Sequence, residues 1–262
     1  MTKGVLLFAH NSPSVDYYAM AVATAKRIKH FLDLPVTVVT DSNTVLTETE
    51  VFDQILFATP DPSNIKLKEV WINKGRYQAY ALSPYDQTIL LDIDYVINSY
   101  TLLKTFDLPT DFCCHHTSRF LMQPDAETER LSRVSFKIVW ATVVRFDKTP
   151  RSKQIFDCLE MIQNNYVYYS QLHRFVHSPF RNDFALTLAL RMVNGHLAIP
   201  DHVIPWNLVH VGNNTTIHRV SDTEYIAMFD KWRNSKIVKE YVPIKDADFH
   251  MMNKTNFMEL IK

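Results

Sequence analysis

The sequence predicts an α/β fold with a mostly parallel sheet and flanking helices. Short, continuous apolar segments at residues 4–9, 35–40 and 88–91 are typical of strands that are covered on both faces. A segment with apolar residues at helical spacing lies between the first two, so the chain starts as strand, helix and strand. No internal repeat, low-complexity stretch or linker divides the sequence, and we expect a single domain over residues 1–262.

The composition is that of an ordinary globular protein with a substantial core. Of the 262 residues, 47% are hydrophobic and 21% are charged, and the formal net charge is zero. A nonspecific nucleic-acid binder usually carries a basic excess, so the neutral balance argues against one. The three cysteines show no disulfide framework, and no segment resembles a signal peptide or a transmembrane helix. We therefore expect a cytoplasmic protein.

Local signals place several further elements. Ser12 is expected to cap the first helix, residues 15–31, which ends in basic residues that suit the helix dipole. Asn182 is expected to cap a helix over residues 183–193, with Gly195 as its C-terminal cap. The remaining expected elements are strands at residues 55–57 and 197–200, one long strand or two strands over residues 134–144, and a helix over residues 73–82.

The strand at residues 88–91 leads directly into Asp92 and Asp94. Ligands in open α/β sheets bind at the carboxyl ends of the strands, which is where these two aspartates are expected. Two carboxylates so close together repel each other unless a cation lies beside them, and their hard oxygen atoms suit Mg²⁺ or Mn²⁺. The alternative is that the two aspartates only begin a loop, one of them capping a turn.

The segment around these aspartates resembles a known family. Residues 85–97, Tyr-Asp-Gln-Thr-Ile-Leu-Leu-Asp-Ile-Asp-Tyr-Val-Ile, are similar to the metal-binding segment of GT-A glycosyltransferases, particularly the glycogenin-like and galactosyltransferase-like group. The resemblance implies a Rossmann-like, nucleotide-diphospho-sugar transferase fold with a mixed, mostly parallel sheet and flanking helices. It also implies an enzyme that uses Mn²⁺ or Mg²⁺ and a nucleotide-sugar donor, UDP-linked, to glycosylate an acceptor hydroxyl.

The same resemblance implies roles for residues elsewhere in the chain, because the matching stretches follow in the family's order. The nucleotide and its diphosphate would be bound by Ala9, His10, Asn11, Asp41, Asn73, Lys74, Arg76, Tyr77 and Lys254. His250 would complete the metal shell with Asp92 and Asp94, and Asn182 and Asp183 would face the sugar or the acceptor. The sequence departs from the glycogenin-like pattern after His250, where the family has a glycine and a Lys-Pro-Trp.

Several of these residues also have purely structural explanations. Lys74 and Arg76 could form a solvated helix face, and the helix dipole alone explains an acidic residue such as Asp183. A zinc site at residues 113–116, Cys-Cys-His-His, is not expected, because adjacent ligands cannot easily wrap one metal.

Two other functional classes stay open. Haloacid-dehalogenase-type phosphotransferases also place Asp-x-Asp after an apolar strand, with Asp92 then the nucleophile, but the sequence has no Gly-Asp or Asp-Asp pair to hold their magnesium. A catalytically silent nucleotide-sugar-binding protein is the second. If the chain is a transferase, its acceptor could be a saccharide, a protein or a hydroxymethylated DNA base, as in some phage enzymes, which work in the host cytoplasm. Basic residues over 119–153 keep the DNA acceptor open.

Overall fold

The computed structural model describes residues 1–59, 65–66, 69–70, 75–123, 129–133, 135–175, 179–197, 202–233 and 235–260. The strands are β1 Lys3–Phe8, β2 Val36–Thr40, β3 Gln54–Phe57, β4 Ile65–Lys66, β5 Glu69–Val70, β6 Gln87–Leu91, β7 Tyr95–Val96, β8 Phe112–His115, β9 Ser118–Phe120, β10 Trp140–Asp147, β11 Leu208–Val211, β12 Thr216–Arg219, β13 Glu224–Arg233, β14 Lys236–Lys245 and β15 Phe249–Met251. The α-helices are α1 Tyr17–Leu32, α2 Ala79–Leu82, α3 Pro150–Asn164, α4 Tyr166–Leu172, α5 Asn182–Val193 and α6 Lys254–Leu260. Short 3₁₀ helices cover Thr49–Val51, Arg76–Gln78 and Thr101–Asp107.

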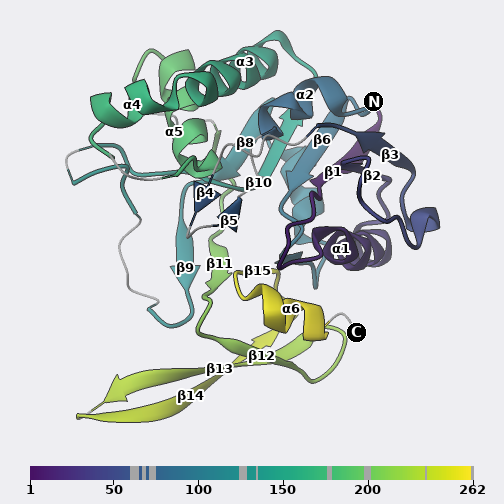
Figure 1. Ribbon diagram of the computed structural model, residues 1–262, viewed down its shortest axis with the longest axis vertical. Helices are drawn as coiled ribbons and strands as arrows, with labels where there is room; N and C mark the ends of the chain where they lie inside the picture. Colours follow the sequence, from purple (N-terminus) through teal and green to yellow (C-terminus); the bar gives the residue numbers. More distant parts are fainter. Residues whose placement is uncertain are drawn as a thin grey trace.

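A six-stranded sheet in the order β3-β2-β1-β6-β10-β8 forms the centre of the molecule (Figure 1). The first four strands run parallel to one another, and β10 runs antiparallel to both β6 and β8. The predicted α/β class with a mixed, mostly parallel sheet is confirmed. Its central strands are apolar because both faces are covered: Val5, Leu6 and Leu7 of β1 have no exposed surface.

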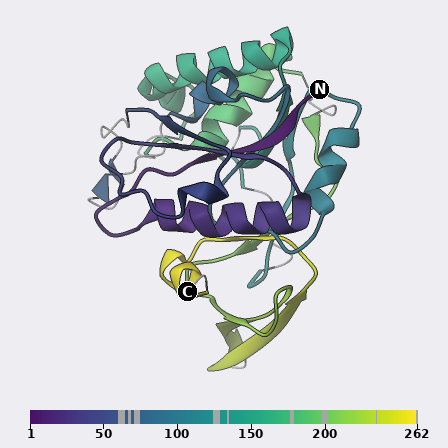
Figure 2. The ribbon, with the colours of Figure 1, turned by 90° about the vertical axis from the view of Figure 1, so that its right-hand side faces the viewer.

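Helices cover both faces of this sheet, α1 on one side and α3 with α5 on the other (Figure 2). Helix α1 starts later than the sequence predicted. Its N-cap is Asp16, whose carboxylate accepts a hydrogen bond from the Ala19 amide at 3.0 Å, whereas the predicted cap Ser12 accepts one from the Val15 amide in the loop before it. The basic end was predicted correctly, with Lys29 and His30 in the last turn.

Helix α5 was predicted in the right place but with the wrong cap. Asn182 is its first helical residue and Arg181 its N-cap, which forms no capping hydrogen bond through its side chain. Gly195, with φ of +61°, follows the end of the helix, and the His196 amide donates to the Arg191 carbonyl at 2.6 Å, as the sequence predicted for a glycine-terminated helix.

Other boundaries moved by several residues. The strand expected over residues 134–144 is β10, Trp140–Asp147, so it begins six residues later. Of the strand expected at 197–200, residues 198–200 lie outside the described residues, and Leu197 is in a bend. Residues 73 and 74 of the helix expected over 73–82 also lie outside them, and the described remainder is a 3₁₀ helix followed by the four-residue α2.

Two smaller sheets lie at one end of the central sheet. One has the strand order β7-β15-β11-β9. In it, β7, which directly follows Asp94, pairs with β15, which contains His250. The strands β12, β13 and β14 form an antiparallel sheet, and the long β13–β14 hairpin projects from the body of the molecule (Figure 1). No helix in the described residues is long and apolar enough to cross a membrane.

Candidate metal and nucleotide site

The carboxyl ends of three neighbouring parallel strands bring the predicted site residues to one edge of the central sheet. Strand β6 leads into Asp92, β1 leads into Ala9, His10 and Asn11, and β2 leads into Asp41. Strand β1 lies between the other two in the sheet. This edge is where α/β sheets bind ligands.

Asp92, Asp94 and His250 form the centre of the candidate site. One ligand atom from each of the three side chains lies within 4.8 Å of the others. A tight turn sets the two aspartates, because the Tyr95 amide donates to the Asp92 carbonyl at 3.1 Å. Strand β15 then pairs with β7, which places His250 opposite Tyr95 and brings its Nε2 atom to 3.0 Å from Oδ2 of Asp94.

Two cations from the protein partly neutralise these carboxylates. The Arg76 guanidinium is buried and donates to Oδ1 of Asp92, and the Lys254 ammonium pairs with Oδ2 of Asp94. The Nη2 atom of Arg76 is buried and has no hydrogen-bond partner among the described residues. Arg76 also lines a small cavity together with Asn182 and the apolar side chains of Leu90, Phe112, Ala141, Val144, Phe156, Leu159 and Leu186.

The donor set fits a hard divalent cation. Arg76 contacts Oδ1 of Asp92, and Lys254 contacts Oδ2 of Asp94. The remaining carboxylate oxygens, Oδ2 of Asp92 and Oδ1 of Asp94, take part in no hydrogen bond within the described part of the chain. Burial lowers the pKa of His250, against the opposing effect of the Asp92 and Asp183 carboxylates, so its imidazole is available as a neutral ligand. Two carboxylates with one imidazole suit Mn²⁺ and, less well, Mg²⁺.

His210 contacts His250 on the side of the ring that faces away from Asp94. The sequence did not single out this residue. It lies on β11, paired with β15 so that His210 is opposite His250, and the two Nδ1 atoms are 2.9 Å apart. Its ring is fully buried and packs against Phe120 and Trp140, with centroids 4.8 and 4.3 Å away. Burial, with a smaller effect of His250, holds the pKa of His210 far below its ordinary value, so the ring is neutral. Forty residues of sequence separate the pair, and no local motif signals the contact.

The residues expected around the nucleotide have mixed surroundings. His10 lies 3.7 Å from the Asp41 carboxylate, and both residues stand at the ligand-binding edge. Ala9 is fully buried, and its backbone amide and carbonyl bond to Val39 and Thr40. The side-chain oxygen of Asn11 accepts from the Tyr18 amide at 2.8 Å, so it already helps to hold the start of α1.

The residues expected on the helix before β6 are only partly described. Asn73 and Lys74 lie outside the described residues. Arg76 faces Asp92 directly, rather than standing apart as a solvated helix face. Tyr77 is half-buried and accepts a hydrogen bond from Gln78 at its hydroxyl, at 3.2 Å.

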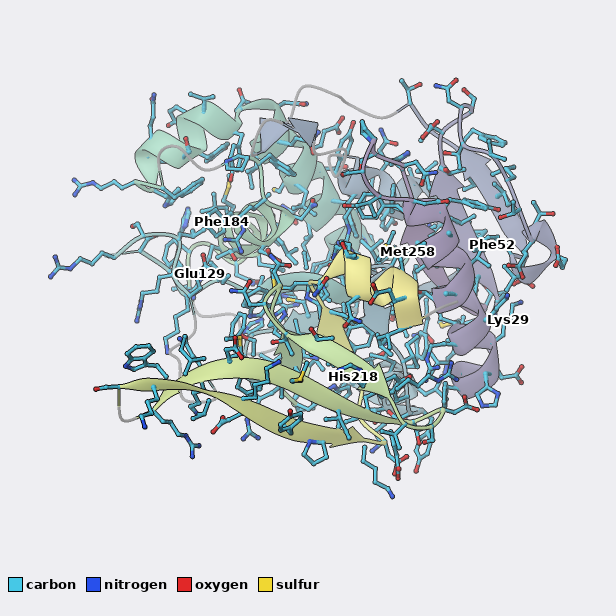
Figure 3. The ribbon with its side chains drawn as sticks, turned by 60° about the horizontal axis from the view of Figure 1, so that its bottom comes forward. Lys29, Phe52, Glu129, Phe184, His218 and Met258 are labelled. Carbon is cyan, nitrogen blue, oxygen red and sulfur yellow. The ribbon has the colours of Figure 1, made fainter. Side chains whose placement is uncertain are left out.

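Asp183 is tied to the frame of the site. One of its oxygens accepts from the Ala141 amide at 2.8 Å, and the other accepts from Arg181 at 3.3 Å. Arg181 also donates two hydrogen bonds to Glu129, and its guanidinium lies over the Phe184 ring. Figure 3 labels Glu129 and Phe184, which lie on the same side of the molecule. Asp183 therefore joins the start of α5 to β10 through a hydrogen bond, in addition to the interaction with the helix dipole that the sequence suggests.

The Cys-Cys-His-His segment has no metal-like arrangement among the described residues. Cys113, Cys114 and His115 belong to β8 and are fully buried. Burial raises the pKa of the Cys113 thiol to about 12 and lowers the pKa of His115 to about 3. These side chains are core residues, in line with the structural explanation.

Comparisons with known proteins give structural likenesses alone. No protein-family model and no curated protein sequence matches the chain. Among solved structures, the galactosyltransferase LgtC, in complex with donor and acceptor sugar analogues, is similar at a TM-score of 0.48 and 12% identity, over 71% of this chain and 70% of that one. Mouse xyloside xylosyltransferase 1 is similar at a TM-score of 0.45 and 12% identity, over 78% and 85%. The glycosyltransferase GlyE of Streptococcus pneumoniae TIGR4 is similar at a TM-score of 0.41 and 13% identity, over 74% and 43%.

Proposed function

We propose that this protein is a metal-dependent glycosyltransferase that moves a sugar from a nucleotide-diphosphate sugar to an acceptor hydroxyl. The observation that carries the proposal is the meeting of Asp92, Asp94 and His250 at the carboxyl end of a buried parallel strand, with Arg76 and Lys254 beside them. A divalent cation bound there would neutralise the charge of a leaving diphosphate.

The two basic side chains suit the same chemistry. Arg76 and Lys254 now pair with the aspartates, and both are close enough to the metal ligands to meet a phosphate oxygen once a cation takes over the carboxylates. Fixed positive charge beside the leaving group stabilises the transition state as the bond between sugar and phosphate breaks. His10 and Asp41, from the adjacent strand ends, would contact the base or ribose of the nucleotide, UDP in the resembling family.

We place the reacting sugar and the acceptor near the start of α5. Asp183 and Asn182 lie there, and the Asp183 carboxylate is near enough to the metal ligands to affect the pKa of His250. In this proposal the whole chain, residues 1–262, acts as one catalytic domain.

A saccharide or protein hydroxyl suits the acceptor site better than a DNA base. The basic stretch over residues 119–153 is less available than the sequence predicted, because Arg145 is buried beside Asp147 and Lys153 pairs with Asp157 at 2.7 Å. Phosphate neutralisation provides most of the affinity of DNA binders, so fewer free cations weaken that candidate.

The decisive experiment is calorimetric titration with a panel of nucleotide sugars, in Mn²⁺ and again in chelator. We expect one donor to bind only with the metal present, and Asp94→Asn to abolish this binding. Asp157→Asn is the matched control, since that carboxylate sits in an exposed pair on α3. Its binding should equal that of the wild type.

Each outcome separates the remaining classes. No binding of any nucleotide sugar with Mn²⁺ present would refute the proposal, and a panel of phosphatase substrates would then test Asp92 as a nucleophile. Metal-dependent binding with neither transfer to any acceptor nor hydrolysis of the donor would instead identify a silent nucleotide-sugar-binding protein.

A further inference from the structure

The projecting β13–β14 hairpin has two faces of opposite character. On the face turned to the body, called here the inner face, Tyr225, Ala227 and Phe229 are buried at the base. Further out on that face, Glu240 forms ion pairs with Lys231 and Arg233. The inner face is thus a packed base followed by a salt-bridged, solvated section, as expected of a hairpin that leaves the protein body.

The opposite face, called here the outer face, is apolar and exposed. It consists of five directly opposed pairs, which are Glu224 with Lys245 at the base and then Ile226 with Pro243, Met228 with Tyr241, Asp230 with Lys239 and Trp232 with Ile237. Trp232, Ile237 and Tyr241 have 69, 64 and 61% of their surface exposed. Aromatic and aliphatic side chains in a row at this exposure mark a surface that another molecule covers.

The charges of the outer face indicate which class of molecule covers it. The face carries two acids and two bases, and each acid lies directly opposite a base: Glu224 opposite Lys245 at the base of the hairpin, and Asp230 opposite Lys239 within the apolar row. With no net charge, it offers no attraction to the phosphates of a nucleic acid or of anionic lipids. The pattern is instead complementary to itself.

We propose that the outer face packs against the same face of a second copy of this chain, around a two-fold axis parallel to the strands. That rotation lays β13 of one copy over β14 of the other. Asp230 then meets the second copy's Lys239, and Trp232 meets its Ile237. Both contacts occur twice, as a two-fold interface requires.

The alternative two-fold arrangement is unfavourable. An axis across the strands, centred on the same residues, would put Asp230 over Asp230 and Lys239 over Lys239, and like charges face to face oppose association. Placing that axis midway between two neighbouring pairs would bury Asp230 of one copy against Met228 of the other, without an opposite charge, which costs desolvation free energy. Only the parallel arrangement satisfies both the charges and the apolar side chains.

The expected association is weak. The outer face has five residue pairs, whereas a standard interface uses about 20–30 residues on each side. We therefore expect a concentration-dependent dimer, with a dissociation constant on the order of micromolar or higher. Sedimentation velocity of the full chain over a wide range of protein concentrations should detect it.

Charge reversal tests the pairing between copies. Asp230→Lys turns the pair at positions 230 and 239 into two bases, and Lys239→Asp turns that pair into two acids. Each variant alone should dimerise about tenfold or more weakly than the wild type. An equimolar mixture of the two should recover the dimer as a one-to-one heterodimer, because every base then meets an acid of the other copy. The double variant should dimerise like the wild type.

The mixture also separates the proposal from simple damage to the hairpin. Each single reversal removes the cross-strand attraction within its own hairpin, and mixing cannot repair that loss. The proposal is overturned if the wild type stays monomeric up to about 1 mM, because only an association weaker than millimolar would escape detection at that concentration. Single variants that dimerise like the wild type, or a mixture that recovers nothing, also overturn it. Monomeric wild type that instead floats with phosphatidylserine vesicles would assign the outer face to a lipid surface.

Discussion

The Nδ1 atom of His250 lies 2.9 Å from the Nδ1 atom of His210, so one of these two nitrogens must carry a proton and donate a hydrogen bond to the other. If Nε2 of His250 binds a metal, that atom must present a lone pair, and its proton must then sit on Nδ1. His210 would accept the hydrogen bond from that N–H at its own Nδ1. The neutral state of His210, which its burial favours, supplies the acceptor.

We expect His210→Phe to weaken Mn²⁺ binding by about 10–100-fold, the usual effect of removing a residue that orients a metal-binding histidine. Titration calorimetry or the electron paramagnetic resonance signal of free Mn²⁺ measures this without any activity assay. His210→Asn keeps an acceptor and should retain part of the affinity. His218→Phe is the control, because His218 is exposed on β12, near the hairpin base (Figure 3). Unchanged affinity in His210→Phe would contradict a positioning role.

Arg76→Met should destabilise the metal-free protein by about 3 kcal/mol, because it leaves the partly buried Asp92 carboxylate without its guanidinium partner. A divalent cation can replace that positive charge. We therefore expect Mn²⁺ to raise the Tm of the variant more than it raises the Tm of the wild type. Differential scanning calorimetry with Mn²⁺ and with chelator tests this. An equal metal effect in both proteins would show that Arg76 and the metal do not share Asp92.

The stability of the fold should fall with acid in a way that depends on His115. Burial lowers the pKa of His115 to about 3 in the folded state, whereas the unfolded residue titrates near 6.5. The unfolded state therefore binds the proton first, and the contribution of His115 is fully present above pH 6.5. It is lost as the pH falls from 6.5 towards 3, at up to about 1.4 kcal/mol per pH unit.

His116, whose pKa burial lowers to about 4, acts in the same direction. Urea unfolding at pH 7, 6 and 5 should show a steeper loss in the wild type than in His115→Phe, which has one titrating group fewer. Comparison of slopes removes any constant effect of the substitution on packing. Parallel slopes would mean that His115 is not buried as a neutral ring.

Gly4→Ala should be destabilising because of Tyr85. A Cβ at position 4 would lie 2.4 Å from the Tyr85 ring, whose hydroxyl is also held at 2.9 Å from Thr37. The ring cannot move without losing that hydrogen bond, so we expect a cost of about 1–3 kcal/mol.

Tyr85→Leu provides the matching half of a double-mutant cycle. In that background the added methyl group has room, and Gly4→Ala should cost much less than in the wild type. Chemical denaturation of the four proteins gives the coupling free energy. Additive effects would show that the ring is not what restricts position 4.

The sequence was most informative where a few neighbouring residues carry the whole signal. The apolar run at 88–91 predicts a buried strand, and the alternation of acid and apolar residues after it places Asp92 and Asp94 at the end of that strand. Arg76 and Asp92 were both singled out, but their ion pair was not predicted, because a contact across sixteen residues leaves no trace in the local pattern. The hairpin was missed, although the alternation of Tyr225, Ala227 and Phe229 is a strand signal that could have revealed its first half.

The caps show the limit of local reasoning most clearly. Ser12, Asp16 and Asn182 are all good capping residues, and their intrinsic preferences do not decide which one is used. The packing of α1 against the sheet fixes where that helix can begin, and it selects Asp16. At α5, Asp183 bonds to the Ala141 amide on β10, which draws Asn182 into the first turn.

The sequence by itself determined the α/β class, the buried parallel strands and the position of the acidic pair, because hydrophobic periodicity and strand ends are local properties of the chain. Only the tertiary structure decided which distant side chains complete the site. The pairing of β11, β15 and β7 brings His250 and Lys254 to Asp94 and brings His210 to His250, and the register of that pairing is set by the packing of the whole molecule.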